Sequence, residues 1–259
     1  MTDLKLTVLA ALSGLVIVGC LPASVIIIVP ASSNIFLAGQ PATSGNTTPA
    51  CTTTNLGCLP PELDFIPVAG NVLTFAGPGV PSPGITGTVS PCPGCGSAGP
   101  DGANLGSQLP ATNISSGSTI SGIQFTGVEF FLVGVFLGPT LPASQVASIG
   151  NYATGAVVTS SQAVYTPLIG QTFFVGDGLT GTGSGSIQQF IVPTGATRLF
   201  LGFADAIFFN GQAGFYGDNT GSLAANVQIV PASTPEPGSV ALMALGLAAL
   251  VIGRRKLFA

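Results

Sequence analysis

The sequence contains no histidine and no tryptophan, and charged residues make up only 5% of its 259 residues. Without histidine, neither a Ser-His-Asp triad nor a Cys-His pair can form in this chain. The low charge, together with 37 glycines and 21 prolines, disfavours long amphipathic helices and favours turns. These absences exclude histidine-dependent nucleophilic enzymes and indicate a chain of short elements joined by loops.

Basic residues are almost missing from the middle of the chain. Between residues 32 and 234, Arg198 is the one base and stands against seven acidic residues, which gives a net charge of −6. A surface with almost no positive charge cannot neutralise the phosphates of a nucleic-acid backbone, so nucleic acid is excluded as a partner. Acidic oxygens without opposing bases suit hard cations such as calcium, which is available outside the cell.

The acidic residues offer no catalytic pair in the sequence. Glycoside hydrolysis needs two carboxylates at a defined separation. Glu129 falls in an apolar segment expected to be a buried strand, whereas Glu62 and Asp64 fall in a proline-rich loop. Because no spacing joins two of these groups, we predict that the protein is not an enzyme.

Strand-like segments recur between stretches rich in Gly, Pro, Asn and Ser. They cover residues 35–38, 72–76, 84–89, 124–135, 171–175, 187–192, 198–203 and 222–230. Short strands at loop-length spacing, without a helical period, predict an all-β fold with a single β-sandwich domain. The nearly continuous apolar segment 128–137 is expected to be a central strand that is buried on both faces, with Glu129 near its start.

The N-terminal residues have the pattern of a secretion signal. Lys5 precedes an apolar stretch over residues 6–29 that is interrupted by Cys20 and Pro22. Small or apolar residues at positions 29–31 suit signal peptidase, so we expect the mature chain to start at Ser32. The expected organisation is a signal peptide at 1–31, a β-sandwich domain at 32–233 and a sorting segment at 234–259.

A second mode of N-terminal processing stays open. Residues 17–20 (Ile-Val-Gly-Cys) resemble a lipobox, whose Cys20 would be acylated to give a lipoprotein. Against this alternative, residues 25–29 would remain on the mature protein as an exposed apolar patch. A lipid at one end would also be redundant with a sorting helix at the other.

The C-terminal residues have three parts in a fixed order. These are the triplet Pro235, Glu236 and Pro237, an apolar run over residues 240–252, and the basic cluster Arg254, Arg255 and Lys256. The uncharged run is expected to be a short hydrophobic helix in the membrane. It covers roughly 20 Å of a hydrocarbon core of roughly 30 Å, which suits a transient anchor. The basic cluster should stay in the cytoplasm, which leaves the preceding domain outside.

In this arrangement the tail resembles the PEP-CTERM signal of bacterial exosortase substrates. The resemblance implies two partners, a sorting protease of the exosortase type that cuts near the triplet and the membrane that holds the tail. It also implies that the domain is released to, or fixed on, the cell envelope. An ordinary tail anchor fits the hydropathy equally well, but an uncleaved anchor is normally longer.

Four cysteines follow the predicted signal peptide: Cys51, Cys58, Cys92 and Cys95. Export predicts that all four are oxidised. Of the three possible pairings we favour the local one, because Cys51 and Cys58 bracket a loop and Pro93-Gly94 bends the chain between Cys92 and Cys95. A four-thiolate zinc site and a redox Cys-x-x-Cys motif are the alternatives.

One constellation near the end of the domain has the chemistry of a calcium site. A strand leads to Asp205, and residues 214–222 (Gly-Phe-Tyr-Gly-Asp-Asn-Thr-Gly-Ser) precede the next strand. This segment resembles the calcium-dependent galactose lectins typified by the bacterial PA-I lectin, which are jelly-roll β-sandwiches. The resemblance implies calcium as a cofactor, with Asp205, the Phe215 carbonyl, Asp218 and Asn219 as ligands.

The match departs from the lectin pattern at two points. The loop after Asp205 is longer than in the lectins, and Phe215 stands where they have Thr. The alternative is an ordinary turn, because Asp, Asn and Gly favour turns for local reasons. We therefore predict an exported envelope or matrix protein with a structural or adhesive role. A calcium-dependent carbohydrate-binding module, with extracellular polysaccharide as its partner, is the alternative function.

Overall fold

The computed structural model describes residues 24–41, 57–65, 70–75, 84–102, 111–114, 119–126, 128–147, 161–205 and 216–230. Within these ranges, no helix has both the length and the apolar character to cross a membrane. The sorting tail, including the short helix expected at 240–252, lies outside the described residues. The same is true of residues 1–23.

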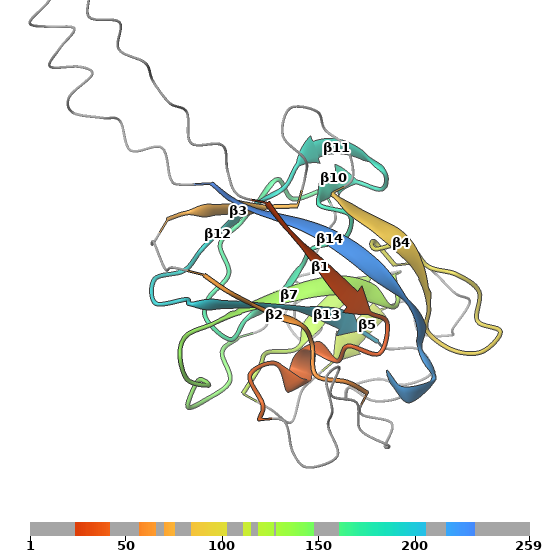
Figure 1. The fold of residues 1–259 in the computed structure, drawn as a ribbon, viewed down its shortest axis with the longest axis horizontal. Helices are drawn as coiled ribbons and strands as arrows, with labels where there is room; N and C mark the ends of the chain where they lie inside the picture. Colours follow the sequence, from red (N-terminus) through yellow and green to blue (C-terminus); the bar gives the residue numbers. More distant parts are fainter. Residues whose placement is uncertain are drawn as a thin grey trace, which may run out of the picture.

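The strands form two larger sheets and two small hairpins (Figure 1). The first sheet has the order β1 (Ser24–Pro30), β14 (Thr220–Val230), β3 (Val72–Thr74), β12 (Gln189–Ile191) and β8 (Val164–Tyr165), and β4 (Ile85–Ser90) also pairs with β14. The second sheet has the order β2 (Glu62–Asp64), β13 (Arg198–Ala204), β7 (Phe131–Leu137) and β9 (Thr172–Phe174). The hairpins are β5 (Ala111–Ile114) with β6 (Ile123–Thr126) and β10 (Leu179–Gly181) with β11 (Ser184–Ile187).

Strand β7 lies in the middle of the second sheet, between β13 and β9. All seven of its residues are buried, and they pair with β13 from Phe131 opposite Ala204 to Leu137 opposite Arg198. A strand covered on both faces needs apolar side chains at every position, which explains the continuous hydrophobic run. The prediction of a doubly buried central strand is confirmed for this segment.

Aromatic side chains connect the two sheets through the core. Phe190 of β12 stacks on Tyr165 of β8, with ring centroids 5.1 Å apart, and lies 5.2 Å from Phe173 of β9. Phe173 in turn stacks on Phe136 of β7 at 5.2 Å. Since Phe190 belongs to the first sheet and Phe173 to the second, these contacts support a sandwich arrangement. The all-β prediction is confirmed, and the jelly-roll type stays a prediction.

Three of the predicted strands are wrong in detail. One of them, 187–192, is divided between β11, which ends at Ile187, and β12, which starts at Gln189. Residues 35–38 do not form a strand, because Ile35–Leu37 is a 3₁₀ helix, η1, whose first turn is capped by Asn34. The Asn34 side chain accepts a hydrogen bond of 2.9 Å from the Phe36 N–H, as N-cap residues do. The segment 124–135 is two strands, because Phe130 breaks it with a positive φ of 52°.

Strand β1 comes from the segment assigned above to the signal peptide. It pairs antiparallel with β14 along its whole length, from Ser24 opposite Gln228 to Pro30 opposite Ser222. Ile27 and Val29 face the core, whereas Ile26 and Ile28 are exposed. Figure 1 shows β1 and β14 running side by side.

Candidate functional site

The two ends of the described domain lie at one end of the β1–β14 ladder. Ser24, where the described chain begins, is paired with Gln228, and β14 ends two residues later at Val230. The first and last described residues of this ladder therefore lie close together, at the same end of β1 and β14 (Figure 1).

A buried hydrogen-bonded cluster surrounds the predicted calcium ligand Asp205, which follows β13. Asn219 donates from Nδ2 to Asp205 Oδ2 at 2.9 Å and to the Ala31 carbonyl oxygen at 3.2 Å. The Tyr216 hydroxyl donates to the Phe203 carbonyl oxygen at 2.9 Å and accepts from the Asp205 N–H at 3.2 Å. These bonds tie η2 (Tyr216–Asp218) to the end of β13 and to the segment after β1.

The same cluster affects how Tyr216 ionises. Its side chain is buried, and removal from water raises the pKa of the phenol well above its usual value. The nearby Asp205 carboxylate raises this pKa further. The phenol therefore stays neutral and can donate its proton to the Phe203 carbonyl oxygen.

The structure brings together two of the four predicted calcium ligands. Asp205 and Asn219 are in contact, whereas the Asp218 side chain is exposed and Phe215 lies outside the described residues. In the described part of the chain, no three His, Cys, Asp or Glu residues form a group that could hold a metal. Asn219 presents its NH₂ group to Asp205, and its buried Oδ1 has no hydrogen-bond partner among the described residues. Calcium binding stays a prediction.

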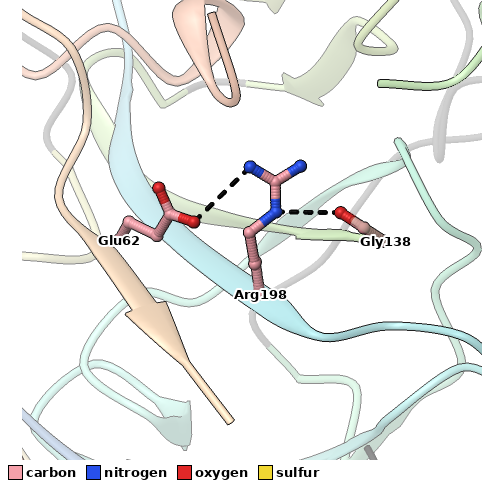
Figure 2. Close-up of polar contacts among 3 residues, drawn as sticks. All are labelled: Glu62, Gly138 and Arg198. Carbon is pink, nitrogen blue, oxygen red and sulfur yellow. Dashed lines mark hydrogen bonds and ion pairs between the residues drawn. The ribbon is translucent and has the colours of Figure 1, made fainter. Parts of the chain in front are cut away.

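Arg198 is the first residue of β13, whereas Asp205 follows the last one. Figure 2 shows the contacts of Arg198 with Glu62 and Gly138. Its Nη1 is 3.5 Å from Glu62 Oε1, and its Nε donates to the Gly138 carbonyl oxygen at 2.8 Å. The guanidinium group also lies over the Phe200 ring, 5.4 Å from its centroid. Partial burial raises the pKa of Glu62, although the charge of Arg198 acts in the other direction. A half-exposed pair of this kind stabilises a fold only weakly.

A pair of buried acids was not predicted from the sequence. The Asp177 N–H donates to Asp101 Oδ1 at 2.9 Å, although 76 residues separate them. The Asp177 carboxylate accepts from the N–H groups of Leu179 at 2.8 Å and Gly183 at 2.7 Å, which orders the β10–β11 hairpin. Burial and the negative charge of Asp177 raise the pKa of Asp101 to about 6, and burial raises the pKa of Asp177. In the sequence, the Asp-Gly pairs at both positions indicate turns and nothing more.

The cysteines follow the expected local pattern where the structure describes them. Cys92 and Cys95 form a disulfide, with Cα atoms 5.3 Å apart. Cys58 is also disulfide-bonded, to a partner outside the described residues. Its pairing with Cys51 stays a prediction.

Comparison with known protein families gives a match in the C-terminal tail. Residues 233–256 match the PEP-CTERM protein-sorting motif. The chain carries a PEP-CTERM signal. This motif marks an exported protein of the cell envelope or surface, and it implies recognition by exosortase and association with the membrane. No curated protein and no solved structure matches the chain, so the lectin resemblance rests on the residues quoted above.

Proposed function

We propose that this PEP-CTERM protein is a structural or adhesive component of the bacterial envelope or extracellular matrix, without enzymatic activity. The observation that carries the proposal is the sorting motif at residues 233–256, three residues beyond the end of β14. Exosortase sorting delivers the domain to the cell surface. A domain attached there can act structurally, by covering the cell surface, or adhesively, by joining that surface to the matrix.

The position of β14 suits such a role. It is hydrogen-bonded to β1 along one edge and to β4 and β3 along the other. A force applied to the tail would therefore act on the backbone hydrogen bonds along both edges of this 11-residue strand. Because many backbone hydrogen bonds must break together under such a load, the attachment point resists local unfolding.

The charge of the domain suits an uncharged polymer as its neighbour. Between residues 32 and 234 there is one base against seven acids, so the surface has little with which to bind anionic chains. Extracellular polysaccharide recognised through hydroxyl and amide groups is the partner class that we propose.

Deletion and complementation in the native host test this role. We expect a strain without the protein to lose surface adherence or matrix cohesion, and the full chain to restore it. A chain truncated after Thr234 should be secreted and should fail to restore the phenotype. Unchanged adherence in the deletion strain would contradict the proposal.

The alternative function is calcium-dependent carbohydrate binding. It is supported by the contact between Asp205 and Asn219 and by the unsatisfied Oδ1 atom of Asn219, which is an oxygen ligand of the kind calcium prefers. If this function is correct, calcium raises the melting temperature of the exported domain and a chelator lowers it. The double variant Asp218→Ala, Asn219→Ala should lose that response. Equal melting of the wild type with calcium and with chelator would eliminate this alternative.

A further inference from the structure

Strand β1 is an integral part of the first sheet. Ile27 and Val29 are buried opposite Ala225 and Leu223, which are themselves buried residues of β14. Ile26 and Ile28 point away from the core and are exposed. This alternation is that of a strand at the edge of a sandwich, with one face on the core.

The residues after β1 continue into the domain without a break. The Ala31 N–H donates to the Gly221 carbonyl oxygen at 3.0 Å, and the Ala31 carbonyl oxygen accepts from Asn219. The Ser32 carbonyl oxygen accepts from the Cys58 N–H at 2.7 Å. The Ser33 carbonyl oxygen accepts from the Phe203 N–H at 2.8 Å. Residues 24–33 thus bind both sheets.

We propose that residues 24–31 remain in the mature exported protein, so that the export cleavage falls before Ser24 and not after Ala31. Cleavage after Ala31 would remove β1, uncover the apolar side chains of Leu223, Ala225 and Val227, and take away one acceptor of the Asn219 amide. It would also remove the hydrogen bond from the Ala31 N–H to the Gly221 carbonyl oxygen and leave a charged amine at Ser32. The reaction itself is hydrolysis of one peptide bond by an envelope signal peptidase, with water as the second reactant.

The structure also makes the apolar patch that would follow upstream processing smaller than the sequence suggests. An exposed apolar patch at residues 25–29 counted against retaining this segment, but the fold covers Ile27 and Val29, so that only Val25, Ile26 and Ile28 of this segment stay exposed. Cleavage further upstream thus yields a complete sheet. Residues 17–20 are the upstream candidate in the sequence and lie outside the described residues.

The amine chemistry of this chain permits a direct test. Lysine occurs at positions 5 and 256 and nowhere between them. An amine-reactive reagent applied to protein from the native envelope therefore marks the new N-terminus, which digestion and mass spectrometry then identify. We expect a first residue at or before Ser24, with residues 25–29 present. A blocked N-terminus with an intact mass that fits lipid on Cys20 also supports the proposal. A first residue at Ser32, or at any position after Ser24, would overturn it.

A pair of variants gives an independent readout on the exported protein. Val29→Ala removes a buried side chain, whereas Ile28→Ala changes an exposed one. We expect Val29→Ala to lower the melting temperature of the exported protein by roughly 5–10 °C and Ile28→Ala by less than about 2 °C. If the segment is removed during export, both variants yield the wild-type mature chain, and identical melting temperatures would overturn the proposal. This inference depends on export and not on the adhesive role, so either can fail without the other.

Discussion

At the residue scale, the buried carboxylates of Asp101, Asp177 and Asp205 each accept a hydrogen bond from an N–H donor. Asp177 accepts two backbone hydrogen bonds, and Asp205 accepts one from the Asn219 amide. A buried carboxylate without such donors would cost several kcal/mol, on the order of the desolvation penalty of an ion. Arg198, the one base of the region, is held by Glu62 and by a backbone carbonyl group instead.

Asp101 makes the stability of the domain depend on pH. Its pKa is about 6 in the folded protein, against an ordinary value of 3.8. Because the folded state binds this proton more tightly, the free energy of unfolding rises as the pH falls from about 7 to about 4. The gain is complete below the ordinary value of 3.8 and is lost as the pH rises through about 6.

The variant Asp101→Asn tests this dependence. Asn keeps an oxygen that can accept from the Asp177 N–H but cannot titrate, so we expect a flatter stability profile between pH 4 and pH 7. The raised pKa of Asp177 accounts for the dependence that remains. Urea unfolding at a series of pH values measures the effect. A variant with the same slope as the wild type would show that Asp101 is not the group responsible.

A second residue-scale prediction concerns the amide of Asn219. In Asn219→Ala, the buried Asp205 carboxylate and the Ala31 carbonyl group both lose a donor. We expect a loss of about 2 kcal/mol in the free energy of unfolding. The neighbouring change Asp218→Ala removes an exposed side chain and should cost less than about 0.5 kcal/mol. Urea denaturation of both variants in chelator gives the comparison, and equal costs would refute the role assigned to the Asn219 amide.

At the scale of elements, the long buried strands could be predicted from the sequence and the polar connections could not. The runs that became β7 and β13 are apolar at nearly every position, and all but the first residue of β13 are buried. By contrast, η1 is stabilised by a single side-chain cap from Asn34. At the break before β7, the Phe130 ring stacks on the Phe203 ring, with centroids 4.6 Å apart. Such contacts form between residues far apart in the chain or override local propensity, so hydrophobic pattern does not reveal them.

The close approach of η1 to β13 gives an element-scale prediction. A Cβ atom at Gly202 would lie 2.8 Å from the Ser33 carbonyl oxygen and 3.0 Å from the Ile35 nitrogen. We expect Gly202→Ala to destabilise the domain by about 1–3 kcal/mol, since the backbone there must shift. Gly99→Ala is the matched control, because nothing lies within 4 Å of its added Cβ. A thermal melt in which the two variants behave alike would show that η1 does not pack on β13 as described.

At the scale of the whole molecule, the sorting tail could be predicted from local sequence, but the place of β1 could not. The tail is a linear signal in which order, hydropathy and charge are sufficient. An apolar stretch at an N-terminus fits both a signal peptide and an edge strand, and the pairing partner that distinguishes them lies about 200 residues away, in β14. The calcium motif was predictable in part. Asp205 and Asn219 are in contact, as the motif implies, but the same contact also fits a hydrogen-bonded cluster without a metal ion.

We expect exosortase sorting to place this domain on the cell surface with its tail removed. The most direct measurement is the intact mass of the protein purified from the envelope of mature cells. We expect a chain that ends near Pro237, without the apolar run and the basic residues 254–256. Recovery of a chain that still carries Arg254, Arg255 and Lys256 would contradict it.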